Sequence, residues 1–237
     1  MKQKILLTLC LILLGAGPSL AQKPTVSNYF DYDRAWRADP LYDSAVQQSQ
    51  SMPHAFSFYT LRLYYMQGSH YDPVGEEPQK ELFSAAERAL QAKDPTQLYD
   101  ALDTARSVLW NHAANLAVVE MGETLSKRDK RLGKPEYYAW LRKGLMTEVM
   151  NSGDGSSPET AYDVITLEEE RELLDRLNLK ITRSETVQEE NEWYNMYEIT
   201  KPDGTPSIIF VNATYPLSKV KKMTGRGPAP EIGDFRQ

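Results

Sequence analysis

Apolar residues recur at helical spacing through most of the first two thirds of the chain. Between residues 55 and 67 they occupy nearly every face of a helix, which is typical of a helix buried between neighbours, and Gly68 is a natural end for it. Four amphipathic stripes follow, with apolar residues three or four positions apart. They are Leu82 to Leu90, Leu98 to Leu109, Ala113 to Met121 and Tyr138 to Val149.

Short polar breaks separate these stripes, as in antiparallel helical hairpins stacked side by side. One helix is predicted to begin at Asp94-Pro95, because Asp caps a helix well and Pro suits its first turn. Small residues on the stripes would let neighbouring helices approach closely, as in tetratricopeptide-type helix pairs. They are Ala101, Ala105, Ala113 and Ala117. No repeat of about 34 residues is present, so a regular array is not predicted.

The pattern changes after the stretch Asn151 to Pro158, whose Gly, Ser and Pro residues make it the clearest break in the chain. Residues 161–165 favour a short strand. Thr166, with Glu169 three residues later, predicts a helix that begins in a capping box. Residues 179–187 have the composition of a strand.

Two further β-rich runs, 193–200 and 207–213, flank Lys201 to Pro206, where Pro and Gly suit the tight turn of a β-hairpin. The predicted fold class is therefore α+β, mostly α. Antiparallel, tetratricopeptide-like helical hairpins are followed by a small α+β region that contains a β-hairpin.

These patterns divide the chain into five parts. The weak pattern before the helices predicts a loosely structured arm, and the Gly- and Pro-rich end predicts a flexible tail. The parts are a signal peptide at 1–21, an N-terminal arm at 22–52, a helical-hairpin region at 53–151, a small α+β region at 152–216 and a tail at 217–237.

The start of the chain has the features of a secretory signal peptide. Lys2 and Lys4 precede an apolar run from Ile5 to Leu14, and small residues at Ser19 and Ala21 predict cleavage after Ala21. The apolar run is shorter than the roughly 20 residues of a membrane-spanning helix. We therefore expect an exported protein, periplasmic or secreted, with no transmembrane segment in the mature chain.

Charge and cysteine content narrow the set of partners. The net charge of −6 disfavours nonspecific binding to nucleic acid or to anionic lipid. Cys10 is the single cysteine and lies inside the predicted signal peptide. We therefore expect a mature chain with neither a disulfide nor a lipid anchor.

Few residues have the spacing of a catalytic or metal site. The three histidines, His54, His70 and His112, show no metal-ligand spacing, so no metal and no cofactor is expected. No serine lies in a Gly-x-Ser-x-Gly elbow. The loop with His70 and Glu76 has a carboxylate-histidine composition, but a solvated loop is the favoured interpretation.

Three other features have a structural and a functional interpretation. The Ser152 to Gly155 stretch lacks the Lys of a phosphate loop and the acidic spacing of a calcium loop, which favours a structural junction. The acidic run Glu168 to Glu170 complements a helix N-terminus, which favours a solvated face. Tyrosines on the helical region would suit a binding surface wherever they are exposed. They are Tyr59, Tyr64, Tyr65, Tyr71, Tyr137 and Tyr138.

Several segments resemble a family of exported bacterial proteins that is classed as a domain of unknown function. They are Phe58 to Arg62, Tyr65 to Gly68, Ser152 to Ser156, Ala161 to Ile165, Glu169 to Leu174 and Ile209 to Thr214. The resemblance covers residues 55–222 and implies export and a two-part layout, but it brings no catalytic residues. The sequence departs from the family after Gly68, where Ser69-His70-Tyr71 replaces an acidic residue and a Thr-Leu segment.

The favoured function is that of a non-enzymatic exported envelope protein that binds an unidentified protein partner. It rests on the export signal, the tyrosine-rich helices and the lack of a convergent catalytic constellation. The alternative is a hydrolase or small-ligand-binding protein with a site in the cleft between the helical and α+β regions. The sequence leaves open whether His70, His112, Asp154 or Asp163 meet in such a site, so the catalytic residues stay unknown.

Overall fold

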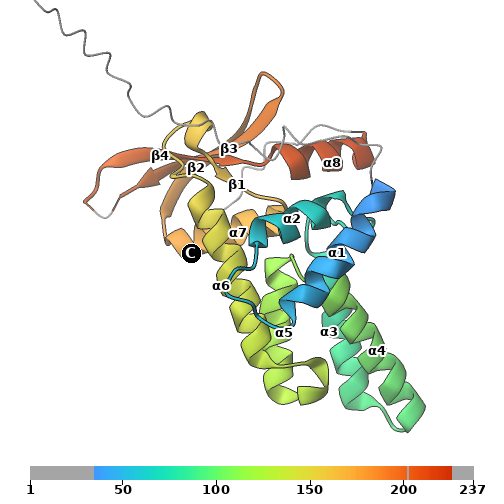
Figure 1. Cartoon of the computed structure of the whole chain (residues 1–237). Helices are drawn as coiled ribbons and strands as arrows, with labels where there is room; N and C mark the ends of the chain where they lie inside the picture. The colour runs from blue at the N-terminus through green and yellow to red at the C-terminus, as the bar shows by residue number, and fades with distance from the viewer. Residues whose placement is uncertain (1–34, 202, 226–237) are drawn as a thin grey trace, which may run out of the picture.

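The computed structural model describes residues 35–201 and 203–225 (Figure 1). The predicted signal peptide at 1–21, its cleavage site and the first part of the predicted arm lie outside these residues. Within the described part, the predicted fold class is confirmed. Paired helices come first, and a mixed four-stranded sheet follows them.

Six α-helices form the helical region: α1 (Ala35–Ser49), α2 (Phe58–Gln67), α3 (Glu77–Gln91), α4 (Pro95–Asn111), α5 (Leu116–Arg128) and α6 (Pro135–Ser152). A short 3₁₀ turn, η3 (Lys130–Leu132), precedes α6. α1 packs against α2, α3 against α4 and α5 against α6, as predicted for helical hairpins. The α3–α4 and α5–α6 pairs extend away from the sheet (Figure 1).

Part of the predicted loose arm is helical. α1 covers residues 35–49, and it buries Tyr42 and Val46 against the helical region. The Tyr42 hydroxyl also donates to the Trp110 carbonyl at 3.1 Å. The prediction of a loose arm was wrong for this segment. Only a few side chains of α1 pack in the core, so the sequence of this segment shows little helical periodicity.

Polar caps set the starts of the helices. The side chains of Ser57, Asp94 and Asn115 accept hydrogen bonds from backbone N–H groups in the first turns of α2, α4 and α5. The predicted start at Asp94-Pro95 and the predicted end at Gly68 are both confirmed. The core between the helices includes Leu61, Leu82, Leu141 and Leu145. It also holds the four alanines predicted to lie between helices, Ala101, Ala105, Ala113 and Ala117, all of which are buried.

The α+β region contains η4 (Pro158–Thr160), β1 (Tyr162–Asp163), α7 (Leu167–Leu177), β2 (Lys180–Glu189), β3 (Glu192–Thr200), β4 (Pro206–Asn212) and α8 (Thr214–Thr224). The strand order is β1-β4-β3-β2, with β1 parallel to β4 and the other pairs antiparallel. The predicted hairpin is β3–β4, which pairs Tyr194 with Asn212 and Thr200 with Pro206. β2 and β3 form a second hairpin.

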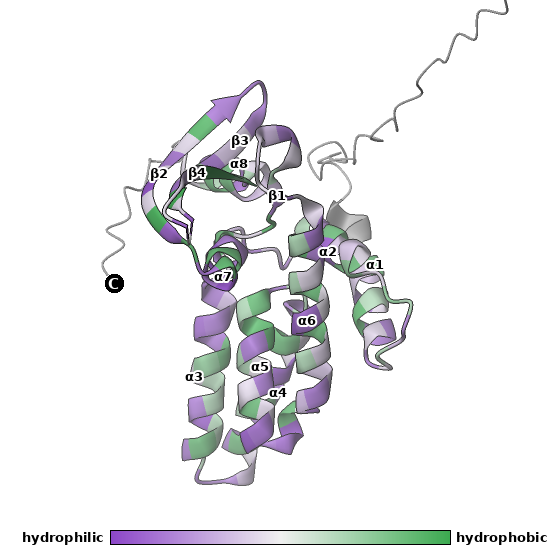
Figure 2. Ribbon diagram, turned by 90° about the vertical axis from the view of Figure 1, so that its left-hand side faces the viewer, coloured by the Kyte–Doolittle hydropathy of each residue, from purple (hydrophilic) through white to green (hydrophobic). Residues whose placement is uncertain are grey.

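The second core lies between α7, the sheet and α8. It combines Leu173 of α7, Tyr197 and Val211 of the sheet and Leu217 of α8 with Val149 of α6. Because Val149 lies on the last helix of the helical region, the two regions share this core. Figure 2 shows α7 between the sheet and the helical region.

The predicted tail boundary at residue 217 was wrong for residues 217–224. These residues belong to α8, which buries Leu217, and Gly225 ends the helix in the left-handed conformation. Residues 226–237 of the predicted tail lie outside the described part. No helix in the described ranges is long and apolar enough to cross a bilayer.

Gly144 lets an aromatic cluster pack against α6. An ideal Cβ on Gly144 would lie 1.9 Å from Cζ of Phe58, whose ring centroid is 4.9 Å from that of Trp140. We expect Gly144→Ala to destabilise the protein by about 1–3 kcal/mol, because this overpacking outweighs the helix propensity gained, which is at most ~1 kcal/mol. Denaturant unfolding measures the change.

Thr147→Ala is the matched control, because Thr147 is an exposed residue one turn further along α6. Its free energy of unfolding should stay within about 0.5 kcal/mol of the wild type. A Gly144→Ala variant as stable as the wild type would contradict the role given to Gly144.

Candidate functional site

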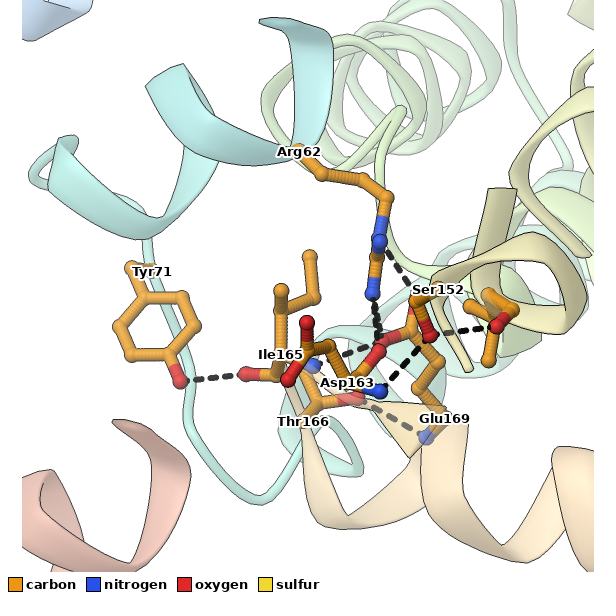
Figure 3. A network of polar contacts seen from close by, with 8 residues as sticks. Arg62, Tyr71, Ser152, Asp163, Ile165, Thr166 and Glu169 are labelled. Atoms are coloured by element: carbon orange, nitrogen blue, oxygen red, sulfur yellow. Dashed lines mark hydrogen bonds and ion pairs between the residues drawn. The ribbon is translucent and has the colours of Figure 1, made fainter. Parts of the chain in front are cut away.

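The most prominent polar site is a buried ion pair between the two regions. Arg62 of α2 and Glu169 of α7 are only 2% and 1% exposed. Arg62 Nε donates to Glu169 Oε1 at 3.2 Å, and Nη2 donates to Oε2 at 2.8 Å (Figure 3). This two-point geometry is the strongest form of an ion pair between these side chains.

Backbone groups complete the contacts of both charges. Arg62 Nη2 also donates to the Asp163 carbonyl at 2.8 Å, and the Ile165 N–H donates to Glu169 Oε2 at 2.7 Å. The Asp163 N–H donates to Ser152 Oγ at 2.8 Å. We call Arg62, Ser152, Asp163, Ile165, Thr166 and Glu169 the junction network (Figure 3). Because both Glu169 oxygens are occupied and both charges are buried, the network holds the regions together.

The predicted capping box is only half formed. The Glu169 N–H donates to Thr166 Oγ1 at 2.9 Å, as predicted. The Glu169 carboxylate, however, accepts from the Ile165 N–H, one residue before the cap, and from Arg62. The charge of Arg62 is the physical reason, since a guanidinium attracts a buried carboxylate more strongly than a single N–H does.

The prediction that Glu168, Glu169 and Glu170 form a solvated face was wrong. All three residues are buried, and each side chain has a different partner. Glu168 pairs with Arg171, which lies three residues later on α7. Glu169 pairs with Arg62. The helix dipole acts on this turn whether or not it is solvated, and the sheet and α2 cover the turn from two sides.

Glu170 is a buried carboxylate held by neutral donors. Asn195 Nδ2 donates to its two oxygens at 2.9 and 2.8 Å, and Tyr197 Oη donates at 2.9 Å. Thr186 Oγ1 donates to Asn195 Oδ1 at 2.7 Å, which fixes the orientation of that amide. Burial raises the pKa of Glu170 to about 7, and the hydrogen bonds from Tyr197 and Asn195 oppose this rise.

The loop between α2 and α3 binds the start of α7. The N–H groups of Leu167 and Glu168 donate to the carbonyls of Pro73 and Val74, both at 3.0 Å. The Tyr71 hydroxyl donates to the Ile165 carbonyl (Figure 3). These bonds satisfy N–H groups that the first turn of a helix leaves without partners.

The Ser152 to Gly155 stretch folds into a turn that contacts the sheet. The N–H groups of Asp154 and Gly155 donate to the Thr160 carbonyl at 2.9 and 2.8 Å. The Phe210 N–H of β4 donates to the Gly155 carbonyl at 2.9 Å. Hydrogen bonds from Ser156, then from Thr160, lower the pKa of Asp154 to about 2.

The four residues whose convergence the sequence left open lie in different surroundings. His70 and His112 are neighbours, with ring centroids 6.2 Å apart. Burial, then the charge of His70, lowers the pKa of His112 to about 4, so its ring is neutral at pH 7. The Nδ1 atom of His112 lies 3.0 Å from Tyr65 Oη. Asp154 lies in the Ser152 to Gly155 turn, and Asp163 lies on β1 and supplies backbone groups to the junction network.

The helical tyrosines do not form a broad exposed surface. Tyr65, Tyr137 and Tyr138 are buried, and Tyr59, Tyr64 and Tyr71 are partly buried. Within the described residues, no group of three or more His, Cys, Asp or Glu side chains is placed to hold a metal ion.

Sequence reasoning missed Arg62 and the donors around Glu170. A signal for Arg62 was present, because a single charge in a helix that is apolar on nearly every face needs a buried partner. Asn195 and Tyr197 gave no such signal. They lie on alternate positions of one strand, and only the fold brings α7 against them.

The fold and the junction network define a two-part protein in which a helical-hairpin body is joined to a small α+β region by a buried ion pair. The model of a domain of unknown function, DUF4919, matches residues 54–219, so the chain belongs to this family. The matched range includes both Arg62 and Glu169. No curated protein and no solved structure matches the chain.

Removing either charge of the junction network should lower the stability of the protein. We expect Arg62→Met and Glu169→Gln each to lower the free energy of unfolding by about 3–5 kcal/mol, because each leaves the other charge buried without its partner. The double variant should lose less free energy of unfolding than the sum of the two single variants, since both changes remove the same interaction. Denaturant unfolding of the four proteins measures the coupling.

Arg183→Met is the control, because Arg183 forms exposed ion pairs with Glu185 and Glu198 on the sheet. Exposed pairs contribute about 0–1 kcal/mol, so its effect should be small. If Arg62→Met and Arg183→Met lowered the free energy of unfolding equally, the junction network would have no special role in stability.

Glu170 makes stability depend on pH. Its pKa of about 7 lies above the ordinary value of 4.5, so its stabilising contribution is complete below pH 4.5 and is lost as the pH rises through 7. Glu170→Gln should remove this loss, which is roughly 3 kcal/mol at most. Between pH 4.5 and 8, the melting temperature of Glu170→Gln should therefore rise relative to that of the wild type as the pH rises.

Glu81→Gln, on the exposed side of α3, is the matched control and should keep the wild-type pH profile. If Glu170→Gln kept that profile too, the carboxylate would not be the group that titrates.

Proposed function

We propose that this protein is a non-enzymatic, exported protein of the bacterial envelope that binds another protein through its α3–α4 hairpin. Export is supported by the basic, apolar and small-residue pattern of residues 1–21. The binding role is supported by exposed apolar side chains on one hairpin.

Phe83 and Leu90 on α3 and Tyr99 on α4 are 52%, 76% and 65% exposed. Phe83 and Leu90 are seven residues apart and therefore lie on one side of α3. Single exposed apolar residues are ordinary, but three large ones on one hairpin favour an interaction site. This observation carries the proposal, and it replaces the tyrosine surface expected from the sequence.

The geometry of the hairpin favours the same role. α3 and α4 extend away from the sheet, which leaves their outer faces open to a partner (Figure 1). A hollow of about 440 Å³ lies between the two helices, and Arg88, Gln97 and Asp100 are among the residues that line it. Polar side chains of the hollow add hydrogen-bonding groups to a hairpin that also exposes apolar side chains, and protein interfaces combine both kinds of contact.

The proposal is tested with a photo-reactive benzoylphenylalanine placed at Phe83, Leu90 or Tyr99 in the native host. Irradiation should give one protein adduct of constant mass at these positions, because the partner would cover them. Matched positions at Glu81 on α3 and Gln188 on β2, both exposed, should give none. Mass spectrometry identifies the adduct.

Leu90→Glu should abolish the adduct formed from position 83, whereas Lys93→Glu, at an exposed site just beyond α3, should not. Adducts at no position, or at all five positions equally, would refute binding through this hairpin.

A further inference from the structure

A second hollow lies at the boundary between the helical and α+β regions. A groove of about 280 Å³ is lined by residues of α5, α6 and α7. The apolar part of its lining consists of Leu116 of α5, which is buried, and Met146 of α6, which is partly exposed. Pockets for drug-sized ligands are about 300–1,000 Å³, so this groove suits a smaller molecule.

Charges of both signs line the groove. Arg142 and Lys143 lie on the α6 side, and Glu172, Asp175 and Arg176 lie on the α7 side. Arg142 is already paired, since its Nε lies 3.1 Å from Glu123 Oε2. Within residues 35–201 and 203–225, none of the other four charged residues, Lys143, Arg176, Glu172 and Asp175, forms an ion pair.

Glu172 is the most constrained of these charges. It is partly buried, and burial is the main reason that its pKa is raised. The nearby carboxylates of Glu120, Glu168 and Asp175 raise the pKa further, and the charge of Arg171 lowers it. A partly buried carboxylate that lies beside other carboxylates favours a bound cationic group.

We propose that this groove binds a small zwitterion of the amino-acid or dipeptide class. The ligand's ammonium group would lie against Glu172 and Asp175, its carboxylate against Lys143 and Arg176, and its apolar side chain on Leu116 and Met146. A few placed charges around an apolar floor are the usual design of a small-molecule site. This site is independent of the α3–α4 hairpin, so either proposal stands or fails without the other.

The test is calorimetric and NMR titration of the purified protein with leucine and leucyl-leucine. N-acetyl-leucine lacks the ammonium group and leucinamide lacks the carboxylate, so both should bind at least tenfold more weakly than leucine. Lys143→Gln and Glu172→Gln should each weaken leucine binding at least tenfold. Lys93→Gln and Glu81→Gln, both exposed on or beside α3, should leave it unchanged.

Unfolding curves show whether each variant is folded, and shifted amide resonances near Leu116 and Met146 place the ligand in the wild-type protein. The proposal would be overturned if neither leucine nor leucyl-leucine bound, if the capped probes bound equally well, or if both groove variants bound like the wild type.

Discussion

A buried guanidinium and a buried carboxylate are tolerated in a protein interior when they meet and when their remaining hydrogen-bonding sites are filled. Arg62 and Glu169 satisfy both conditions, although 107 residues separate them in the chain. Arg62 belongs to the helical region and Glu169 to the α+β region. Either region alone would leave one of these charges without its partner, so the pair favours the one arrangement in which the two regions meet.

The first turn of α7 is the element through which this constraint acts. Its three consecutive glutamates have partners in three directions: Arg171 on the same helix, Arg62 on α2, and Asn195 and Tyr197 on β3. Its first N–H groups bond to the loop that precedes α3. Since one helical turn contacts both regions and the sheet, small changes in its orientation would disturb several buried polar groups at once.

Much of the fold was predictable from local patterns. Helical periodicity, the cap at Asp94 and the Pro-Gly turn before β4 each depend on neighbours in the sequence, and the structure contains the hairpins they predict. The helix within the expected arm and the helix that extends into the expected tail were missed, because α1 and α8 are stabilised by packing on other elements, α1 on α2 and α8 on β3.

The junction network could not be predicted in the same way. Three glutamates at a helix N-terminus satisfy the helix dipole whether they are exposed or buried, so the sequence pattern does not distinguish the two cases. Arg62 carried a partial signal, because its neighbours are apolar on nearly every side, but nothing in the sequence indicated which carboxylate it meets. That choice depends on how α2 and α7 pack.

The position of the α6–α7 groove has a consequence for how a ligand would act there. Glu172 lies three residues after Glu169 on α7, so a ligand held by Glu172 contacts the helix that carries the ion pair. The other wall is α6, which shares the second core through Val149. A ligand bridging α6 and α7 would add to contacts that already join the regions. It would therefore stabilise the existing arrangement, in proportion to its affinity, and would not separate the two regions.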